Sequence, residues 1–311
     1  MNNIFIIGNG FDLDLGLKTK YSDFANSKHW QQLSSCKGEL FCHLKNKKQI
    51  EQWFDIEKEL LSFAHFDVDY LKNNVGKFNP SVDRLDFVKI QEALCAYIDE
   101  QQNEHIKSSS AAAKVLQAVV NNGYFNSVYS FNYTDINVFA RQMGLRQEID
   151  CFHIHGQVAN KSIILGVDEA NLINGYEFLY KTMSPNYHSN NMFDDLVKSS
   201  EIVIFGLSFG SIDYTYFKDF FNCLVNVNRE NNSKKYITIF TKDENSRYDI
   251  MNNLHKMNIN LQKLYAYSYF QVIRTSEAQD KQFLDAFTQR LDKHSKRKNY
   301  ENIRKVESFL Y

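Results

Sequence analysis

The sequence predicts an α/β fold, a mostly parallel β-sheet with a large helical insertion after its first strand. Two patterns indicate this arrangement. After residue 126, short apolar runs alternate with helical patterns, which is typical of parallel strands joined by crossover helices. Before that point, one apolar run at 3–8 is followed only by helical patterns, over residues 20–122. We therefore expect a single domain over residues 1–311 that contains a helical insertion at 20–122.

The first strand is expected at residues 3–8, an isoleucine-rich run that ends at the turn signal Asn9-Gly10. The helical insertion begins with a helix capped by Ser22 that runs through Phe24 and Trp30. Apolar residues then recur every three or four positions, which predicts amphipathic helices at 49–64, 83–105 and 109–121.

The rest of the chain is expected to complete the sheet and both of its helical faces. Apolar runs predict strands at 127–131, 151–155, 162–167, 201–206, 235–241 and 261–270. The intervening patterns predict helices from about Asp135, after a cap at Ser211, and at 243–256 and 276–292. A loop-rich stretch lies at 171–190.

Composition narrows the class of protein. The chain has 311 residues, a net charge of −1 and 43% hydrophobic residues, so it can bury a sizeable core and has no overall attraction to nucleic acid or membranes. The basic run at 293–305 is interpreted as a solvated helix end, with a phosphate-binding patch as the alternative. No apolar run approaches the ~20 residues of a membrane span, and no signal peptide or CxxC pair occurs. These features predict a cytoplasmic protein.

Polar motifs follow four of the predicted strands. Because ligands bind at the carboxyl ends of parallel strands, we expect these motifs to converge on one site. The motifs are Gly8-Asn9-Gly10-Phe11-Asp12, Phe131-Asn132-Tyr133-Thr134-Asp135, His153-Ile154-His155-Gly156 and Gly206-Leu207-Ser208-Phe209-Gly210-Ser211-Ile212-Asp213. Their convergence is a stronger signal than any one motif.

The glycines of the first motif have two interpretations. Gly8 and Gly10 could let the backbone approach a phosphate and point N–H groups at it, or they could simply form a tight turn. The loop is neither a GxGxxG motif, because residue 13 is Leu, nor a Walker A loop. If the phosphate interpretation holds, Gly10→Val should abolish nucleotide binding with little loss of fold.

Asn132 and His155 are the predicted catalytic residues. An Asn side chain can both donate to and accept from a ribose hydroxyl or a water, and a His side chain can accept a proton near neutral pH. The alternatives are a turn residue for Asn132 and a core histidine for His155. His153 is expected to lie deeper and to be structural, and no third ligand is evident for a histidine metal pair, so no metal is expected. Gly206 and Ser208 could approach a phosphate or ribose, or Ser211 and Asp213 could simply begin a helix.

The opening IFIIGNGFDLDLGLKTKYSDF, with WFDIEKEL at 53–60, closely resembles the AbiH family of bacterial abortive-infection proteins, which are associated with defence against bacteriophage. The later motifs SFNYTD, HIHG and GLSFGSID are similar in order to a diverged Sir2-type NAD-binding site. This resemblance implies a Sir2-like, Rossmann-like sheet. The four-cysteine zinc module of Sir2 deacylases is missing, which argues against an acyl-lysine peptide as substrate.

The Sir2 resemblance implies roles for individual residues. Gly8, Asn9, Gly10, Phe11 and Asp12 would surround the NAD diphosphate and nicotinamide ribose. Asn132 and Asp135 would line the nicotinamide pocket, and His155 would be the catalytic base. Gly206, Ser208 and Asp213 would lie in the segment toward the adenosine end.

These roles imply an NAD+ glycohydrolase, an enzyme with NAD+ as substrate and no metal. The alternatives are a nucleotide-binding sensor without catalysis and a protein that acts on nucleic acid. A nucleotide ligand, a phage-derived trigger and a second copy of the chain are the expected partners. The helical insertion at 20–122 lacks site motifs, so we assign regulation or self-association to it.

Overall fold

The computed structural model describes residues 2–50, 54–64, 78–168, 172–210, 213–226 and 234–293. Six strands form one sheet in the order β3-β2-β1-β4-β5-β6, and every pairing between neighbours is parallel. The strands are β1 Asn2–Ile7, β2 Ser127–Ser130, β3 Cys151–His153, β4 Ser199–Phe205, β5 Lys235–Thr241 and β6 Ser268–Arg274. The predicted α/β fold with a mostly parallel sheet is confirmed.

Strand β1 lies at the centre of the sheet, between β2 and β4. Its residue Ile4 is opposite Ser127 on one side and Ile202 on the other. Strand order runs outward from β1 in both directions, so the chain switches from one half of the sheet to the other between β1 and β4. Such a switch point opens a crevice at the carboxyl ends of the two strands.

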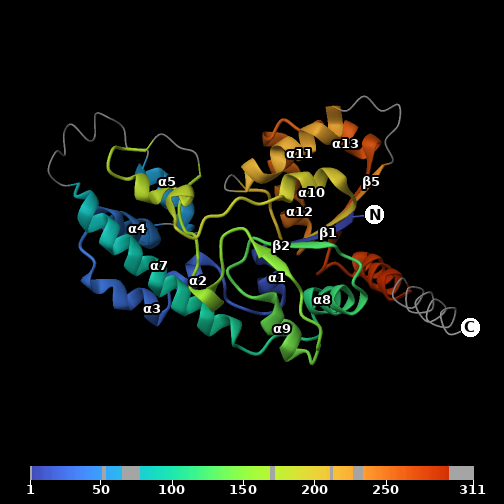
Figure 1. The fold of residues 1–311 in the computed structure, drawn as a ribbon, viewed down its shortest axis with the longest axis horizontal. Helices are drawn as coiled ribbons and strands as arrows, with labels where there is room; N and C mark the ends of the chain where they lie inside the picture. The colour runs from blue at the N-terminus through green and yellow to red at the C-terminus, as the bar shows by residue number, and fades with distance from the viewer. Residues whose placement is uncertain are drawn as a thin grey trace, which may run out of the picture.

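Alternating side chains of the strands build a core on each face of the sheet. In β1, Ile4 and Ile6 belong to one cluster, while Phe5 and Ile7 belong to the other. The first face is covered by α10 Met192–Lys198, α11 Tyr214–Asn226, α12 Glu244–Lys256 and α13 Leu261–Tyr267. The second is covered by α1 Asn9–Asp14, α8 Ala111–Asn122, α9 Ile136–Gln142 and a helix at 281–293. Figure 1 shows these two layers on opposite sides of β1 and β2.

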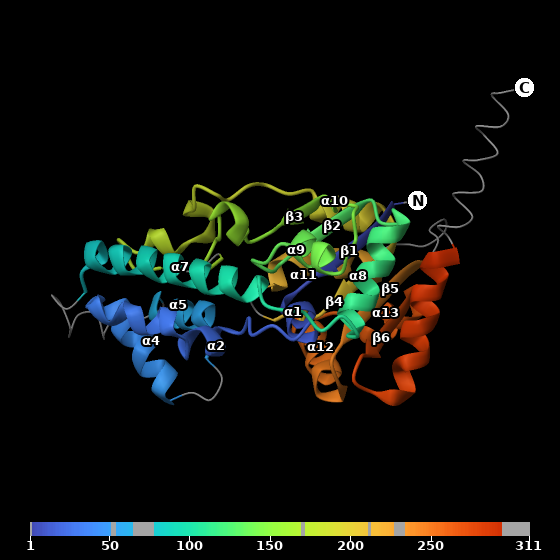
Figure 2. The same cartoon turned by 90° about the horizontal axis from the view of Figure 1, so that it is seen from below.

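A third hydrophobic cluster lies beside the sheet rather than on it. It joins the loop segment 158–179 to a group of helices that we call the helical lobe. The lobe contains α2 Tyr21–Ala25, α3 Lys28–Gln31, α4 Glu39–Ile50, α5 Ile56–Ala64 and α7 Pro80–Gln102. Figure 2 shows α2, α4, α5 and α7 gathered at one side of the molecule. Short 3₁₀ turns lie at Gln32–Ser35, Val158–Asn160, Glu177–Leu179, Lys181–Met183 and Ala278–Asp280.

Two predicted strands are wrong. Residues 162–167 join no strand of the sheet, and only an isolated bridge links Val167 to Tyr180. This apolar run is buried against the helical lobe, since Ile163, Leu165 and Val167 belong to the third cluster. The segment 261–270 contains helix α13, capped by Asn260, before β6 begins at Ser268.

Helix boundaries in the lobe also differ from prediction. The first predicted helix is two short ones, and Ser27 rather than Ser22 caps the second by accepting from the Trp30 N–H. The predicted helix 49–64 is instead the end of α4 followed by α5, with residues 54 and 55 non-helical. The helix predicted at 276–292 begins, after a 3₁₀ turn, at residue 281. The predicted cap at Ser211 and nearly all of the basic run at 293–305 lie outside the described residues.

Candidate functional site

A cavity of about 310 Å³ opens at the switch point of the sheet. Residues that follow the carboxyl ends of β1, β2, β3 and β4 line one side of it, those after β1 lying in helix α1, and residues of the helical lobe line the other. From the sheet side come Asn9, Asp12, Phe131, Asn132, Tyr133, Thr134, His155, Leu207, Ser208, Gly210 and Asp213. From the lobe side come Thr19, Lys20, Tyr21, Ser22, Phe54, Asp55, Glu57 and Ile98. All four predicted motifs contribute residues to this cavity or its immediate support.

Asp12 and Asn132 form the centre of the sheet side. Asn132 Nδ2 donates to Asp12 Oδ1 over 2.8 Å and to the Gly8 carbonyl over 3.1 Å. Thr134 Oγ1 donates to the other carboxylate oxygen of Asp12 over 2.9 Å. The carboxylate is buried, and burial raises its pKa to about 7 although these two hydrogen bonds act in the opposite direction. Asp12 can therefore exchange a proton near neutral pH.

His155 lies among aromatic rings just beyond β3. Its ring centroid is 5.5 Å from that of Phe131 and 6.0 Å from that of Tyr216, both in edge-to-face geometry. Burial lowers the pKa of His155 well below its usual value, and the nearby charge of Lys181 lowers it further. The imidazole is therefore neutral at pH 7, and a ring nitrogen without a proton can accept a hydrogen bond.

Two polar atoms of this wall have no protein partner. Asn132 Oδ1 and His155 Nδ1 are buried, and no hydrogen-bond partner for either atom lies in the described ranges of the chain. Leaving such atoms unpaired costs on the order of 1–3 kcal/mol each. Both residues line the cavity, so a water or a ligand there can pair with these atoms.

His153 occupies a different environment from His155. Its Nδ1 lies 3.2 Å from the main-chain carbonyl of Asn132, and it is not among the residues that line the cavity. It is only half-buried, whereas His155 is 5% exposed. The expectation that His153 lies deeper is therefore wrong. Strand β3 ends at His153, and the chain turns inward before it reaches His155.

The glycines hold two loops together. The Gly8 N–H donates to the Phe205 carbonyl over 2.9 Å, and the Gly10 N–H donates to the Gly206 carbonyl over 2.8 Å. A Cβ on Gly10 would lie 2.6 Å from Gly206 Cα, and one on Gly206 would lie 2.3 Å from the Phe11 nitrogen. These N–H groups are thus already bonded and do not cradle a phosphate. Gly10→Val would disrupt the packing of the two loops, contrary to the predicted small loss of fold.

The remaining predicted residues are divided between cavity and support. Phe11 is fully buried against Phe5 and Phe205 in the core, and Asp135 caps α9 by accepting from the Asn137 N–H. Neither lines the cavity. The predicted binding residues Asn9, Ser208 and Asp213 do line the cavity. Asn9 Oδ1 accepts a hydrogen bond from Thr19 Oγ1 over 2.5 Å. Burial raises the pKa of Asp213 to about 7, although the charge of Lys181 opposes this.

The helical lobe supplies groups that the sequence did not single out as functional. Tyr21 and Tyr133 both line the cavity, and their hydroxyl groups share a hydrogen bond of 3.3 Å that links the lobe to the segment after β2. Glu57 Oε1 lies 3.1 Å from the Nζ of Lys181, which is 1% exposed. Asp55 and Glu57 belong to the WFDIEKEL segment, so that motif was the available signal. The helical insertion at 20–122, which was expected to lack site motifs, therefore contributes one wall of the candidate cavity.

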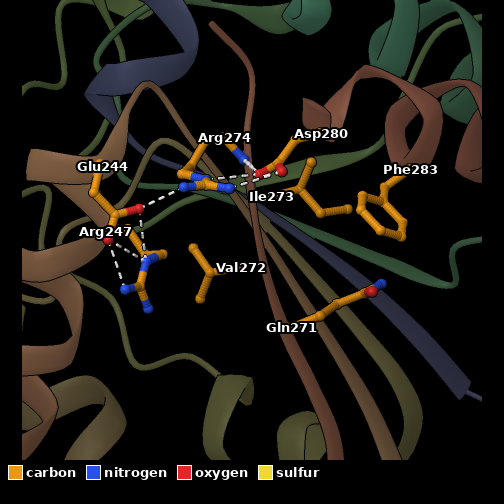
Figure 3. Close-up of a pocket in the computed structure, with 8 residues that line it drawn as sticks. All are labelled: Glu244, Arg247, Gln271, Val272, Ile273, Arg274, Asp280 and Phe283. Carbon is orange, nitrogen blue, oxygen red and sulfur yellow. Dashed lines mark hydrogen bonds and ion pairs between the residues drawn. The ribbon is translucent and has the colours of Figure 1, made fainter. Parts of the chain in front are cut away.

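A second cavity, of about 460 Å³, lies at the end of β6. Figure 3 shows Arg274 between Asp280 and Glu244, with Arg247 below Glu244. Arg274 donates to Asp280 over 2.8 and 2.9 Å and to Glu244 over 2.6 Å, and Arg247 also donates to Glu244 over 2.6 Å. The charges of this cavity neutralise one another, so the cavity at the switch point is the stronger candidate.

Among the residues that the structure describes, no group of three or more His, Cys, Asp or Glu side chains could hold a metal ion. No helix in the described part of the chain is long and apolar enough to cross a bilayer.

Comparison with known proteins gives the family. The sequence model described as "Bacteriophage abortive infection AbiH" matches residues 4–234, which include β1, the helical lobe and the loop after β4. The chain belongs to the AbiH family. Membership implies a role in abortive infection, the defence of a bacterial population against bacteriophage. A search of curated proteins finds no match for this AbiH chain. The matched range contains every residue that lines the switch-point cavity.

Proposed function

We propose that this AbiH protein defends against bacteriophage by cleaving NAD+ at the bond between nicotinamide and ribose. The observation that carries the proposal is the pair of buried, unpartnered atoms, Asn132 Oδ1 and His155 Nδ1, in a cavity at the switch point. A site with these atoms suits a ligand that offers hydroxyl groups, as ribose does.

The topology favours a dinucleotide. The strand order 3-2-1-4-5-6 is the order of doubly wound, Rossmann-type sheets that bind dinucleotides at the β1/β4 switch point. This agrees with the Sir2-like arrangement that the SFNYTD, HIHG and GLSFGSID motifs suggest. The cavity, at about 310 Å³, is at the lower end of small-molecule sites, which run to roughly 1,000 Å³. We therefore expect the nicotinamide ribose inside it and the adenosine end along the loop after β4.

The electrostatics of the cavity suit the reaction. Nicotinamide is a cationic leaving group, and the transition state resembles an oxocarbenium ion on the ribose. Carboxylates near that carbon stabilise the developing charge, as in glycoside hydrolysis. Asp12 lies at the cavity wall with its pKa raised by burial to about 7, so a large fraction is ionised at neutral pH. A neutral His155 can accept a hydrogen bond from a ribose hydroxyl and so orient the sugar.

The diphosphate needs positive charge from elsewhere, because the Gly8 and Gly10 N–H groups are bonded within the protein. Lys20 lines the lobe side of the cavity and is the candidate for that contact. Binding between the sheet and the lobe would make the helical lobe part of the enzyme's control. A phage-derived trigger or a second copy of the chain could act by moving this wall.

The direct test is chromatography of NAD+ after incubation with the purified chain. Wild type should release nicotinamide and ADP-ribose, alone or with lysate from phage-infected cells as trigger. Asn132→Ala should lower turnover at least about 100-fold. Asn46→Ala, at an exposed position on α4, should match wild type. Tight NAD+ binding without turnover in wild type would replace the enzyme proposal by a sensor, and no binding at all would overturn both.

A further inference from the structure

Glu57 is a buried carboxylate that faces the switch-point cavity from the helical lobe. It lies in the first turn of α5 and is 6% exposed. The Asp55 side chain accepts from the Glu57 N–H over 3.0 Å, which fixes the start of the helix. Ile56 and Leu60, on the same helix, pack into the third hydrophobic cluster. The position of Glu57 is therefore set by the lobe, while its side chain reaches the cavity lined by Asp12 and Asn132.

Lys181 forms an ion pair with the Glu57 carboxylate. Its Nζ lies 3.1 Å from Glu57 Oε1 and 3.8 Å from Asp168 Oδ2. Burial alone would lower the pKa of Lys181, but these carboxylates outweigh it and raise the pKa, so the lysine stays charged. The charge of Lys181 favours the ionised form of Glu57, while burial opposes it more strongly and raises the pKa of Glu57 to about 7.

A structural ion pair on the same helix provides a comparison. Glu59 is 1% exposed, and its Oε2 lies 3.3 Å from His43 Nε2 and 3.6 Å from Lys47 Nζ. Both carboxylates are buried and each lies near a lysine, but only Glu57 of the two lines the cavity. This position, together with the unpartnered Asn132 Oδ1 and His155 Nδ1 in the same cavity, points to a ligand at Glu57.

We propose that Glu57 is a second catalytic carboxylate, which faces the reacting sugar carbon from the lobe side, and that Lys181 is its positioning residue. The inference rests on the proposed NAD+ cleavage. In that reaction the bond between C1′ and the nicotinamide nitrogen breaks, and both electrons leave with nicotinamide. The water oxygen forms the new bond to C1′. The proton released from that water passes to the Glu57 carboxylate and then to solvent, giving ADP-ribose.

The candidate site lies between the sheet and the helical lobe, and both sides contribute catalytic groups in this proposal. The sheet side supplies Asp12, Asn132 and His155, and the lobe side supplies Glu57. A shift of the lobe would then remove a catalytic group from the site without unfolding the sheet. The charged groups that act on Glu57 or on Lys181 include Asp55, Asp168 and Asp213. Burial raises the pKa of Tyr21, Tyr133 and Tyr216, and the charge of Glu57 in turn raises it further.

The test compares Glu57→Gln with Glu59→Gln in the full chain, under the conditions in which wild type cleaves NAD+. We expect Glu57→Gln to lower kcat about 100-fold or more with KM changed less than about threefold, because the carboxylate acts on the transition state. Glu59→Gln should keep wild-type kcat provided that it remains folded. Glu57→Asp keeps the carboxylate but shortens the side chain by one methylene, so it should also lower kcat. This variant tests the inference if Glu57→Gln does not fold.

The pH dependence of kcat separates catalysis from a structural role. Ionised Glu57 accepts the proton, so kcat should rise as pH increases through about 7. Asp12 titrates in the same range, so the contribution of Glu57 is measured by the change that a Lys181 variant makes to this profile. Lys181→Met removes the cation that favours ionisation and should move this rise to higher pH. A folded Glu57→Gln variant with wild-type kcat would overturn the inference and leave the proposed function intact. A wild-type chain that never cleaves NAD+ would overturn both.

Discussion

Asn132 Nδ2 donates a hydrogen bond to Asp12 Oδ1 over 2.8 Å, and this bond links the loops after two neighbouring strands, β2 and β1. The same amide nitrogen also bonds to the Gly8 carbonyl, so its oxygen is turned away and has no partner among the described residues. The interaction that orders the two loops thus leaves one acceptor for a ligand. It also places an Asp with a raised pKa beside that acceptor.

The pKa of Asp12 makes stability depend on pH. Its value of about 7 in the fold exceeds the ordinary 3.8, so the folded state prefers the protonated form. The stability that this preference provides is fully present below about pH 4 and is lost as pH rises through about 7. Asp12→Asn removes this titration. Wild type loses this stability between about pH 5 and pH 8, whereas Asp12→Asn does not. We therefore expect the melting temperature of Asp12→Asn minus that of wild type to be a few °C larger at about pH 8 than at about pH 5.

Differential scanning calorimetry at both pH values measures this effect. Asp194→Asn is the control, because Asp194 is an exposed carboxylate on α10 with 65% of its side chain accessible. A constant difference between Asp12→Asn and wild type at the two pH values would show that Asp12 does not titrate in this range.

The close contact between the segments after β1 and β4 predicts that alanine substitutions at three glycines lower the stability of the fold to different extents. Gly10→Ala and Gly206→Ala should each destabilise the fold by about 1–3 kcal/mol or more, because their Cβ atoms would meet backbone at 2.6 and 2.3 Å. Gly206 also has a φ of +73°, which disfavours any side chain. Gly210→Ala should change stability by less than about 0.5 kcal/mol, since its nearest neighbour, Ser208 Oγ, lies 3.7 Å away. Urea titration measures all three, and equal midpoints would contradict the loop packing described above.

The ion pair between Glu57 and Lys181 predicts coupled stabilities. Lys181→Met alone should cost about 3–5 kcal/mol, because it leaves Glu57 buried beside other carboxylates without its cation. Combining it with Glu57→Gln should restore part of that loss, since no buried charge is then left unpaired at residue 57. A double-mutant cycle from urea denaturation measures the coupling. Purely additive losses would mean that the two side chains do not interact in solution.

The two histidines should separate catalysis from structure. His155→Gln keeps a polar side chain between Phe131 and Tyr216 and should lower NAD+ turnover about 10²–10⁴-fold. His153→Ala removes the ring that contacts the Asn132 carbonyl and should lower the melting temperature more than the rate. His105→Ala, at an exposed position, should change neither. A well-folded but inactive His153→Ala beside an active His155→Gln would reverse the assignment.

The sequence alone was sufficient for five of the six strands and for the convergence of the four motifs on one cavity. Strands β1, β4 and β5 are short apolar runs with clear ends, and local patterning is enough to find them. Residues of all four strand-end motifs meet because parallel strands end at one edge of the sheet. That topological rule needs no knowledge of side-chain packing. It brought Asp12, Asn132 and His155 to one cavity.

Tertiary structure decided which roles these residues and their neighbours take. The segment 162–167 has the apolar pattern of a strand but is buried against helices. Burial in a sheet and burial against helices require the same apolar residues, so the pattern does not distinguish them. Gly10 and Gly206 are close in space but far apart in the chain, so no local signal distinguishes loop packing from phosphate binding. Glu57 and Lys181 meet for the same reason, through contacts between the lobe and a distant loop. The periodicity of apolar residues predicts which face of a helix or strand is buried. Which residues pack against that face depends on contacts between distant parts of the chain, and these are set only in the folded protein.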